Sequence, residues 1–250
     1  MTEFVLATYN IRNGRAFDGR NSWPLRKRNT LAVIHALNAD VVCMQEVRPR
    51  QLAWLQAQMK EYEFRAVGRD DGASKGEHMV TALRRGFGLI VSSEPRWFSN
   101  TDDRPSRHPE ALRNRFALVT KLRINGRVIA IANTHLDERS APARRDAVER
   151  LANWYPSDAI VVGDFNCTID DPALSPLFVA GFQDALAHLP ASGPGVGTHH
   201  YFTGTTDETR IDHVLVAPGI TITSAHVVHE QPKGALASDH WPVVANLKID

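Results

Sequence analysis

The chain has 250 residues, 43% of them hydrophobic and 23% charged, which is ordinary for a globular protein and long enough for one α/β domain. Its 29 basic and 28 acidic residues give a formal net charge of +1. Overall charge therefore gives no argument for a polyanionic partner, and any electropositive region has to be local.

The first half of the chain alternates strands and helices. Phe4–Tyr9 predicts a strand, and residues 21–24 predict the start of a helix because a polar cap precedes a proline in the first turn. Val41–Met44 predicts a second strand. A helix near Gln51–Lys60 and extended segments up to Ser92 are expected to follow.

The second half begins with a polar, proline-containing stretch, Ser99–Arg113, which predicts a loop. Phe116–Ile124 and Arg127–Asn133 flank an Asn-Gly pair and predict a β-hairpin. The remaining expected elements are a helix at Arg144–Trp154, a strand at Ile160–Val162, a short helix at Leu174–Ala180, and strands at Ile211–Val216, Ile220–Val228 and Val243–Ile249. Helices mixed with hairpins favour mixed sheets covered by helices.

The segment from Ile160 to Asn166 carries the strongest chemical signal. A buried β-branched strand ends at Gly163 and then presents Asp164 and Asn166, whose side chains point the same way if the chain stays extended. A carboxylate that can take a proton or bind a cation would thus lie beside a neutral donor for an anionic oxygen.

Polar residues also end five other apolar runs. The full set is Asn10, Glu46, His135, Asp164 with Asn166, Asp212, and Asp239 with His240. Neighbouring strands would bring these groups together, and crowded carboxylates stay ionised only with a cation among them. Oxygen donors without a Cys/His cluster favour Mg²⁺ or Mn²⁺ over zinc. Because the set runs from Asn10 to His240, we expect one domain over residues 1–250.

This ordered set resembles the endonuclease/exonuclease/phosphatase superfamily, the deoxyribonuclease-like metal-dependent phosphohydrolases. The resemblance implies an α/β fold, a four-layer αββα sandwich in which two mixed β-sheets pack face to face with helices outside. Residues 68–72, 76–77 and 197–202 resemble a compact bacterial branch of metal-dependent hydrolases. Tyr201 stands where that branch would have glycine, which leaves the shape of its loop and any role for His200 open.

Site roles follow from the resemblance. Glu46 would be the principal ligand of a Mg²⁺ or Mn²⁺ ion, with Asn10 and Asp239. Asp164 would orient or deprotonate the attacking water, and Asn166 would donate to the phosphate.

His135 and His240 would contact the phosphoryl oxygens from opposite sides, each kept cationic by a carboxylate. Asp212 is expected beside His240, and Glu77 is the weaker candidate beside His135. Arg115 matches a position that often carries arginine and could bind phosphate in a bidentate way.

Other basic and histidine clusters have plainer explanations. His199 and His200 resemble a metal pair, but adjacent strand residues face opposite ways, so loop structure is favoured. The cluster 26–28 is expected on the solvent face of its helix rather than on nucleic acid. Arg12, Arg15 and Arg20 either form a cationic rim for an anionic substrate or are solvated loop residues.

Two cysteines, Cys43 and Cys167, are too few for a disulfide framework, and we expect buried hydrophobic side chains. A reactive thiol at Cys167 is the less favoured alternative. No apolar run has the length of a transmembrane helix, and the first residues lack a basic region and a cleavage site, so a cytoplasmic protein without a transmembrane segment is expected.

The leading hypothesis is a Mg²⁺/Mn²⁺-dependent phosphoesterase, with a phosphodiesterase favoured over a monoesterase. A DNA or RNA nuclease is the main alternative, and it predicts activity that falls steeply with salt. A non-catalytic phospholigand-binding protein is less favoured. The expected partner is a phosphorylated substrate; nucleic acid is possible but not required, and no obligate protein partner is evident. Substrate choice is expected to lie in the loops, since fold and motif do not decide it.

Overall fold

The computed structural model describes residues 1–155 and 157–249, which contain two mixed six-stranded sheets. The first sheet has the order β11-β12-β1-β2-β4-β3 and the second the order β5-β6-β7-β8-β10-β9. The strands are β1 (Thr2–Asn10), β2 (Val41–Val47), β3 (Tyr62–Gly68), β4 (His78–Arg84), β5 (Leu89–Trp97), β6 (Phe116–Ile124), β7 (Arg127–His135), β8 (Ala159–Asp164), β9 (Gln183–Asp184), β10 (Asp212–Val216), β11 (Ile220–Val227) and β12 (Val243–Ile249).

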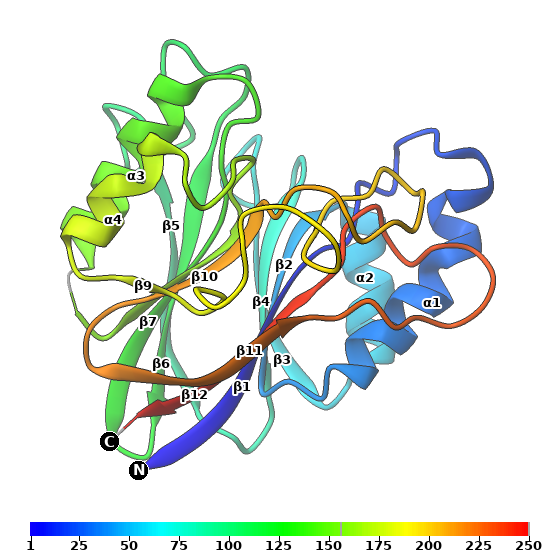
Figure 1. Ribbon diagram of the computed structural model, residues 1–250, viewed down its shortest axis with the longest axis horizontal. Helices are drawn as coiled ribbons and strands as arrows, with labels where there is room; N and C mark the ends of the chain where they lie inside the picture. The colour runs from blue at the N-terminus through cyan, green and yellow to red at the C-terminus, as the bar shows by residue number, and fades with distance from the viewer. Residues whose placement is uncertain (156, 250) are drawn as a thin grey trace.

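The helices lie outside the pair of sheets, so the expected αββα sandwich is confirmed (Figure 1). Helices α1 (Trp23–Ala36) and α2 (Pro49–Gln58) cover the first sheet, and α3 (Ala141–Trp154) and α4 (Ser175–Val179) cover the second. The 3₁₀ turns η1 (Gly19–Asn21) and η2 (Pro172–Leu174) precede α1 and α4. Within the described residues, none of the helices is both long enough and apolar enough to span a membrane.

Each central strand contributes to two apolar layers because its side chains alternate between faces. In β2, Val41 and Cys43 pack into the core between the sheets, whereas Val42 and Met44 pack under α1 and α2. On the second sheet, Ile160 and Val162 of β8 face that central core, and Val161 packs with Val148 and Leu151 of α3. The core between the sheets and the two layers under the helices together account for the apolar runs that predicted the strands.

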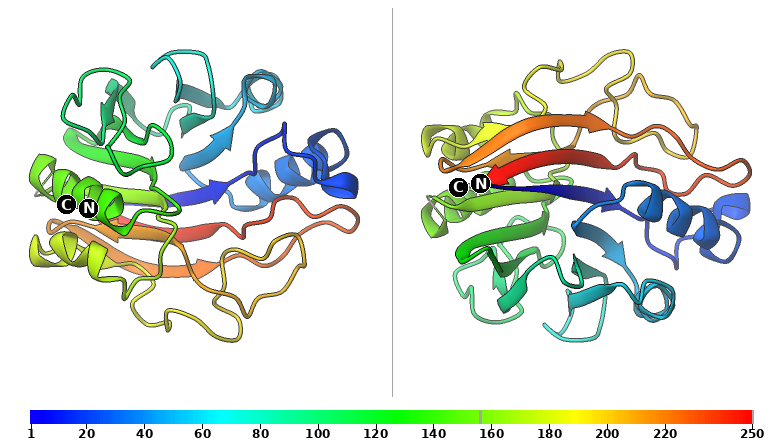
Figure 2. Two further views of the ribbon diagram at one scale, coloured as in Figure 1. Left: turned by 90° about the horizontal axis from the view of Figure 1, so that it is seen from above. Right: turned by 90° about the horizontal axis from the view of Figure 1, so that it is seen from below.

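Strand direction gathers the polar strand ends at one edge of the sandwich. β1 runs parallel to β2, and β7 runs parallel to β8, so their carboxyl ends share an edge. β12 is antiparallel to β1, and β10 is antiparallel to β8, so the starts of β12 and β10 reach the same edge. The chain ends lie together at the opposite side, where Thr2 pairs with Ile249 (Figure 2). Six distant stretches of sequence therefore meet.

Most expected elements are confirmed to within a few residues, including the β6–β7 hairpin and the loop at 99–113. The extended segments expected before Ser92 are the strands β3, β4 and β5, and β5 continues to Trp97. The short edge strand β9 was not predicted. It pairs with only Leu215 and Val216 of β10, and two residues are too few to show a period.

Gly163 is the residue on which the shape of the β8 strand end depends. Its φ is 140°, and a Cβ placed there would lie 1.9 Å from the backbone oxygen of Thr134 on β7. Because a backbone atom cannot move aside as a flexible side chain can, Gly163→Ala is expected to lower the free energy of unfolding by about 3 kcal/mol or more.

Urea unfolding with Gly86→Ala as the matched control tests this expectation. Gly86 also has a positive φ, 84°, but nothing lies within 4 Å of its added Cβ. Its substitution is therefore expected to cost only about 1–2 kcal/mol of backbone strain. Equal losses in the two variants would show that the contact with Thr134 does not restrict residue 163.

Candidate active site

Asp164 lies at the centre of the gathered strand ends. Its Oδ2 accepts a hydrogen bond from Nδ2 of Asn10 at 3.0 Å and lies 3.5 Å from Nε2 of His135 and 3.8 Å from Nε2 of His240. Burial and the nearby charge of Asp212 raise the pKa of the Asp164 carboxyl to about 6. A carboxyl with this pKa can gain and lose a proton near neutral pH.

His240 forms a buried pair with Asp212. Its Nδ1 lies 2.8 Å from Oδ2 of Asp212, the contact that the sequence predicted. Burial opposes the charged form of His240, but the carboxylates of Asp212 and Asp164 raise its pKa to about 10. The backbone N–H groups of Ile211 and Asp212 both donate to Oγ1 of Thr198, which fixes the start of β10. His240 is therefore held as a cation that points at Asp164.

His135 differs from the sequence-based expectation. Burial, followed by the positive charge of Arg115, lowers its pKa well below the usual range, so the imidazole is neutral and not cationic. The expected pairing with Glu77 is wrong: Glu77 instead accepts hydrogen bonds from Asn13 and Arg69. Within the part of the chain that the structure describes, Nδ1 of His135 has no hydrogen-bond partner.

Glu46 has an unusual backbone conformation near the end of β2. The β2–β4 register is irregular between Met44 and Val47, and Glu46 has a φ of 62°, a left-handed value that is costly for a residue with a side chain. The bulge places its carboxylate where Nδ2 of Asn10 lies 3.3 Å from Oε1 and the backbone N–H of Asn13 lies 2.7 Å from Oε2. Such local strain is typical of functional sites.

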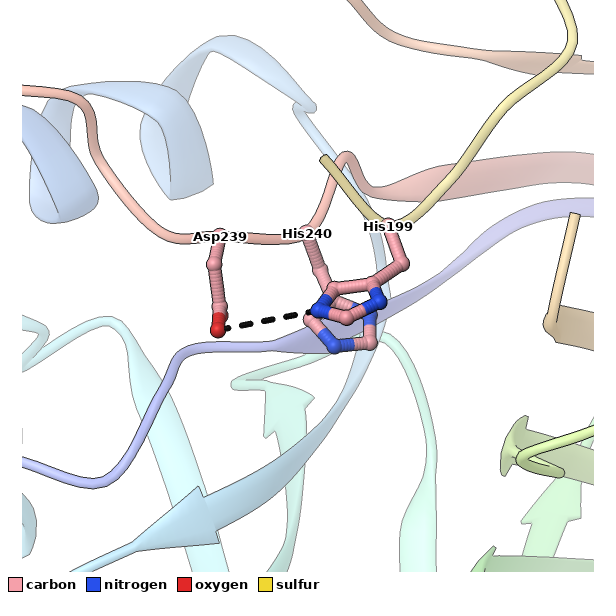
Figure 3. Close-up of side chains that lie close together, drawn as sticks. All are labelled: His199, Asp239 and His240. Atoms are coloured by element: carbon pink, nitrogen blue, oxygen red, sulfur yellow. Dashed lines mark ion pairs between the residues drawn. The ribbon is translucent and has the colours of Figure 1, made fainter. Parts of the chain in front are cut away.

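The side chains of Arg12, His199 and His240 surround Asp239. Nη1 of Arg12 lies 3.2 Å from Oδ2 of Asp239, and Nε2 of His199 lies 3.8 Å from the same oxygen. The rings of His199 and His240 are 4.4 Å apart at 30° (Figure 3). Burial favours the neutral carboxyl, but the His199 contact and the neighbouring positive charges lower the pKa of Asp239. Asp239 is thus an anion in the described structure.

Asn166 reaches the site by a turn rather than along an extended strand. β8 ends at Asp164, and Asn166 has a φ of 52°, so the alternating-strand argument does not apply to this residue. Its backbone N–H donates to Oδ1 of Asp164, and its Nδ2 donates to the Leu136 carbonyl. Among the described residues the amide nitrogen has this one acceptor, so its second N–H is available for a ligand.

A cleft of about 600 Å³ opens beside these groups. Its lining includes Asn166, His199 and Asp239, together with the exposed Tyr201. Arg115, expected to bind phosphate, is buried; burial and the positive charge of Arg69 lower its pKa, and the nearby Asp164 carboxylate opposes that shift. Within the described residues, Nε of Arg115 has no hydrogen-bond partner, so this guanidinium retains donor capacity.

The oxygen donors fit a hard divalent cation better than the histidine clusters do. Two groups have possible ligand atoms within 4.8 Å of one another: His199, Asp239 and His240, and Asp164, Asp212 and His240. In both, Nδ1 of His240 is already bonded to Asp212. By contrast, burial and the like charges of Glu77 and Asp239 raise the pKa of Glu46, a crowding that a cation would relieve.

Asn10 occupies the expected place but faces the other way. Its amide nitrogen points at Glu46 and Asp164, while its oxygen accepts from the backbone N–H of Arg12 at 3.0 Å. Asn10 would therefore serve as a cation ligand beside Glu46 only after rotation of its amide. In the described structure it links the two carboxylates.

A family model described as the Endonuclease/Exonuclease/phosphatase family matches residues 7–240. The chain belongs to this family. Among curated proteins, none matches the chain.

The similarity to solved structures of other proteins extends over the whole fold. A Bacteroides vulgatus member of the endonuclease/exonuclease/phosphatase family is 29% identical, with a TM-score of 0.90 and 100% of each chain covered. A Bacteroides thetaiotaomicron member is 25% identical, with a TM-score of 0.91 and 100% of this chain and 98% of that chain covered. A mannosyl-6-phosphatase from the latter species is 25% identical, with a TM-score of 0.89 and 98% and 100% covered.

This family member also uses residues that the sequence did not identify. Arg26, expected on the solvent face of its helix, is fully buried and donates to the backbone carbonyls of Ile11, Arg12 and Ala237. It thereby joins the loop after β1 to the segment before Asp239. The sequence signal that could have identified Arg26 is its position after Trp23, which matches the pattern of the bacterial branch.

The two cysteines are buried, as expected, and burial raises the pKa of each thiol to about 12. At neutral pH, Cys167 is therefore a protonated thiol and a poor nucleophile. The position of this residue directly after the Asp164–Asn166 turn reflects packing under α3 and α4.

Proposed function

We propose that the protein is a divalent-metal-dependent hydrolase of phosphate esters in which water attacks in line. The observation that carries this proposal is the convergence on Oδ2 of Asp164 of three side chains from different strand ends: Asn10, His135 and His240. Since both sheets contribute to the site, we also propose that residues 1–250 form one domain.

The cation site would be formed by Glu46 and Asp239, with Asn10 after its amide rotates. Mg²⁺ and Mn²⁺ suit such oxygen ligands. When bound, the ion would supply positive charge for the phosphoryl and leaving oxygens. Arg12 would neighbour the same carboxylates, since it already contacts Asp239.

Side chains of the protein would carry out proton transfer and bind the phosphoryl oxygens. Asp164, with a pKa of about 6, would accept a proton from the attacking water. His240, held as a cation by Asp212, would donate a charged hydrogen bond to a phosphoryl oxygen. The neutral His135 would donate from one ring nitrogen, and Arg115 would contribute its buried positive charge.

A phosphodiester remains our first substrate class. A phosphate monoester is the second, favoured by the likeness to a protein described as a mannosyl-6-phosphatase at 25% identity. A nuclease would be recognised by a steep fall of activity with salt, since phosphate contacts release counterions.

A metal-supplemented screen tests the proposal. It should cover nucleotide, phospholipid, inositol phosphate and sugar phosphate esters, with Mg²⁺ and Mn²⁺ in parallel. Turnover of at least one class is expected. Tight binding of one ligand with no hydrolysis in the entire panel would instead favour the non-catalytic alternative.

The pH dependence of kcat/KM is expected to be bell-shaped. Activity should rise through about pH 6 as Asp164 loses its proton and fall near about pH 10 as His240 loses its proton. In Asp212→Asn, both limbs should move to lower pH, because the Asp212 carboxylate raises the pKa of both groups. Asp146→Asn on α3 is the control, and limbs that stay in place in Asp212→Asn would contradict the assignment.

A further inference from the structure

A second cavity, of about 520 Å³, lies at the starts of α1 and α2. We propose, resting on the proposed function, that this cavity binds a second phosphate group carried by the substrate, apart from the ester that is cleaved. Its lining consists of Gly14, Arg15, Trp23, Pro24, Arg48, Pro49, Arg50 and Gln51.

The charge of this lining is unlike that of the chain as a whole. Three of its eight residues are arginines and none is acidic, whereas the protein has a formal net charge of only +1. Among the described residues, no carboxylate forms an ion pair with Arg15, Arg48 or Arg50. Three arginines without an ion-pair partner in one lining favour an anionic ligand.

Arg48 provides a further sign of a missing anionic partner. Its Nε is buried and has no hydrogen-bond partner within the part of the chain that the structure describes. Because that atom is itself inaccessible, a phosphate in the cavity would reach Arg48 through its terminal guanidinium nitrogens. Helices α1 and α2 both begin at the cavity, at Trp23 and Pro49, and their first turns add the positive ends of two helix dipoles.

Hydrogen bonds link the lining of this cavity to the candidate active site. Gln51, which is 1% exposed, accepts a hydrogen bond from the backbone N–H of Gly14 and donates to the carbonyl of Arg12. Asn13, between those two loop residues, donates its backbone N–H to Glu46. A Cβ added at Gly14 would lie 2.6 Å from Cδ of Gln51, so a side chain there would displace the Gln51 amide. One loop thus has the cation site on one side and the arginine cavity on the other.

The apolar part of the lining limits what else could bind. Trp23, Pro24 and Pro49 contribute apolar surface to the lining, which suits an apolar part of the substrate between the two phosphates. Free inorganic phosphate would contact only the arginines. The ligand is a phosphate group in either case, and the experiment distinguishes a phosphate carried by the substrate from free phosphate.

The test uses the double variant Arg15→Ala/Arg50→Ala, since both side chains are exposed and neither belongs to the candidate catalytic groups. Lys121→Ala/Arg123→Ala is the matched control: it also removes two exposed cations, and Arg123 lies near the far end of β6. The substrates are thymidine 5′-(p-nitrophenyl phosphate) and its 3′-phosphorylated form. The KM of the phosphorylated substrate is expected to rise about tenfold in the cavity variant, and that of the other less than about twofold.

Calorimetric titration with inorganic phosphate, on chelator-treated protein, supplies a readout independent of turnover. Phosphate binding is expected to weaken about tenfold in the cavity variant and to stay unchanged in the control. Equal KM changes for both substrates, or unchanged phosphate binding in the cavity variant, overturn the proposal. A wild-type protein that hydrolyses neither ester, but whose phosphate binding still depends on Arg15 and Arg50, supports the cavity and overturns the proposed function instead. If phosphate binding weakens in the cavity variant but the KM values of the two substrates change equally, the occupant is free phosphate. The substrate proposal is then overturned.

Discussion

Asp164→Asn is expected to lower kcat by about 10²-fold or more, because an amide of the same shape cannot accept a proton from water. The substitution preserves the size of the side chain at the point where Asn10, His135 and His240 converge. Binding of substrate should therefore change less than turnover does. Steady-state kinetics on whichever ester the screen identifies would measure the two effects separately.

The control for this experiment is Asp146→Asn, which removes a partly exposed carboxylate that pairs with Arg150 on α3. Its kcat should match that of the wild type. The unfolding midpoints of both variants should be measured as well, so that a folding defect is not mistaken for lost chemistry. A wild-type kcat in Asp164→Asn, with the metal still required, would remove Asp164 from its proposed role.

Removing the cation is expected to have the largest effect of all. EDTA should abolish turnover, and added Mg²⁺ or Mn²⁺ should restore it, since positive charge at the phosphoryl oxygens is then lost and regained. Glu46→Gln should mimic chelation, with kcat reduced about 10²-fold or more at a fixed metal concentration. Because its Asn10 and Asn13 contacts can partly persist with an amide, the fold should survive.

Two comparisons make the Glu46 result specific. Glu149→Gln, on the exposed side of α3, should require no more metal than the wild type. In Glu46→Gln, raising the metal concentration should recover part of the activity if the lost function is cation binding. Full activity of Glu46→Gln in the presence of EDTA would mean that the carboxylate holds no essential metal.

The sequence predicted the fold well because the signals were local. The Asn-Gly turn between β6 and β7 and the alternation along β2 each depend on a few adjacent residues. The convergence of the polar strand ends was predictable for a different reason. The family resemblance supplied an order of motifs, and parallel pairing of β1 with β2 and of β7 with β8 then brings their ends to one edge.

The charge state of His135 could not be read from the sequence. A histidine motif gives no measure of burial, and in the folded chain burial and Arg115 outweigh the carboxylate that lies 3.5 Å away. Glu77 was misassigned for a similar reason. Its carboxylate accepts hydrogen bonds from Asn13, in the loop after β1, and from Arg69, just after β3. Neither contact could be inferred from the residues next to Glu77 in the sequence.

Backbone conformation was the other feature beyond sequence reasoning. Arg12, Glu46 and Asn166 all have left-handed φ values, of 58°, 62° and 52°. Each of these residues turns the chain just after an apolar run. Its side chain therefore does not follow the alternation between the two faces of a strand. Non-glycine residues rarely adopt this conformation, and no local pattern marks the ones that do.

Anomalous scattering from crystals soaked in Mn²⁺ tests the central claim most directly. We expect one strong manganese peak within direct bonding distance, about 2–2.5 Å, of the Glu46 carboxylate, with Asp239 among its ligands, and no such peak in Glu46→Gln crystals. Manganese bound only elsewhere, or bound equally well in both proteins, would contradict the account.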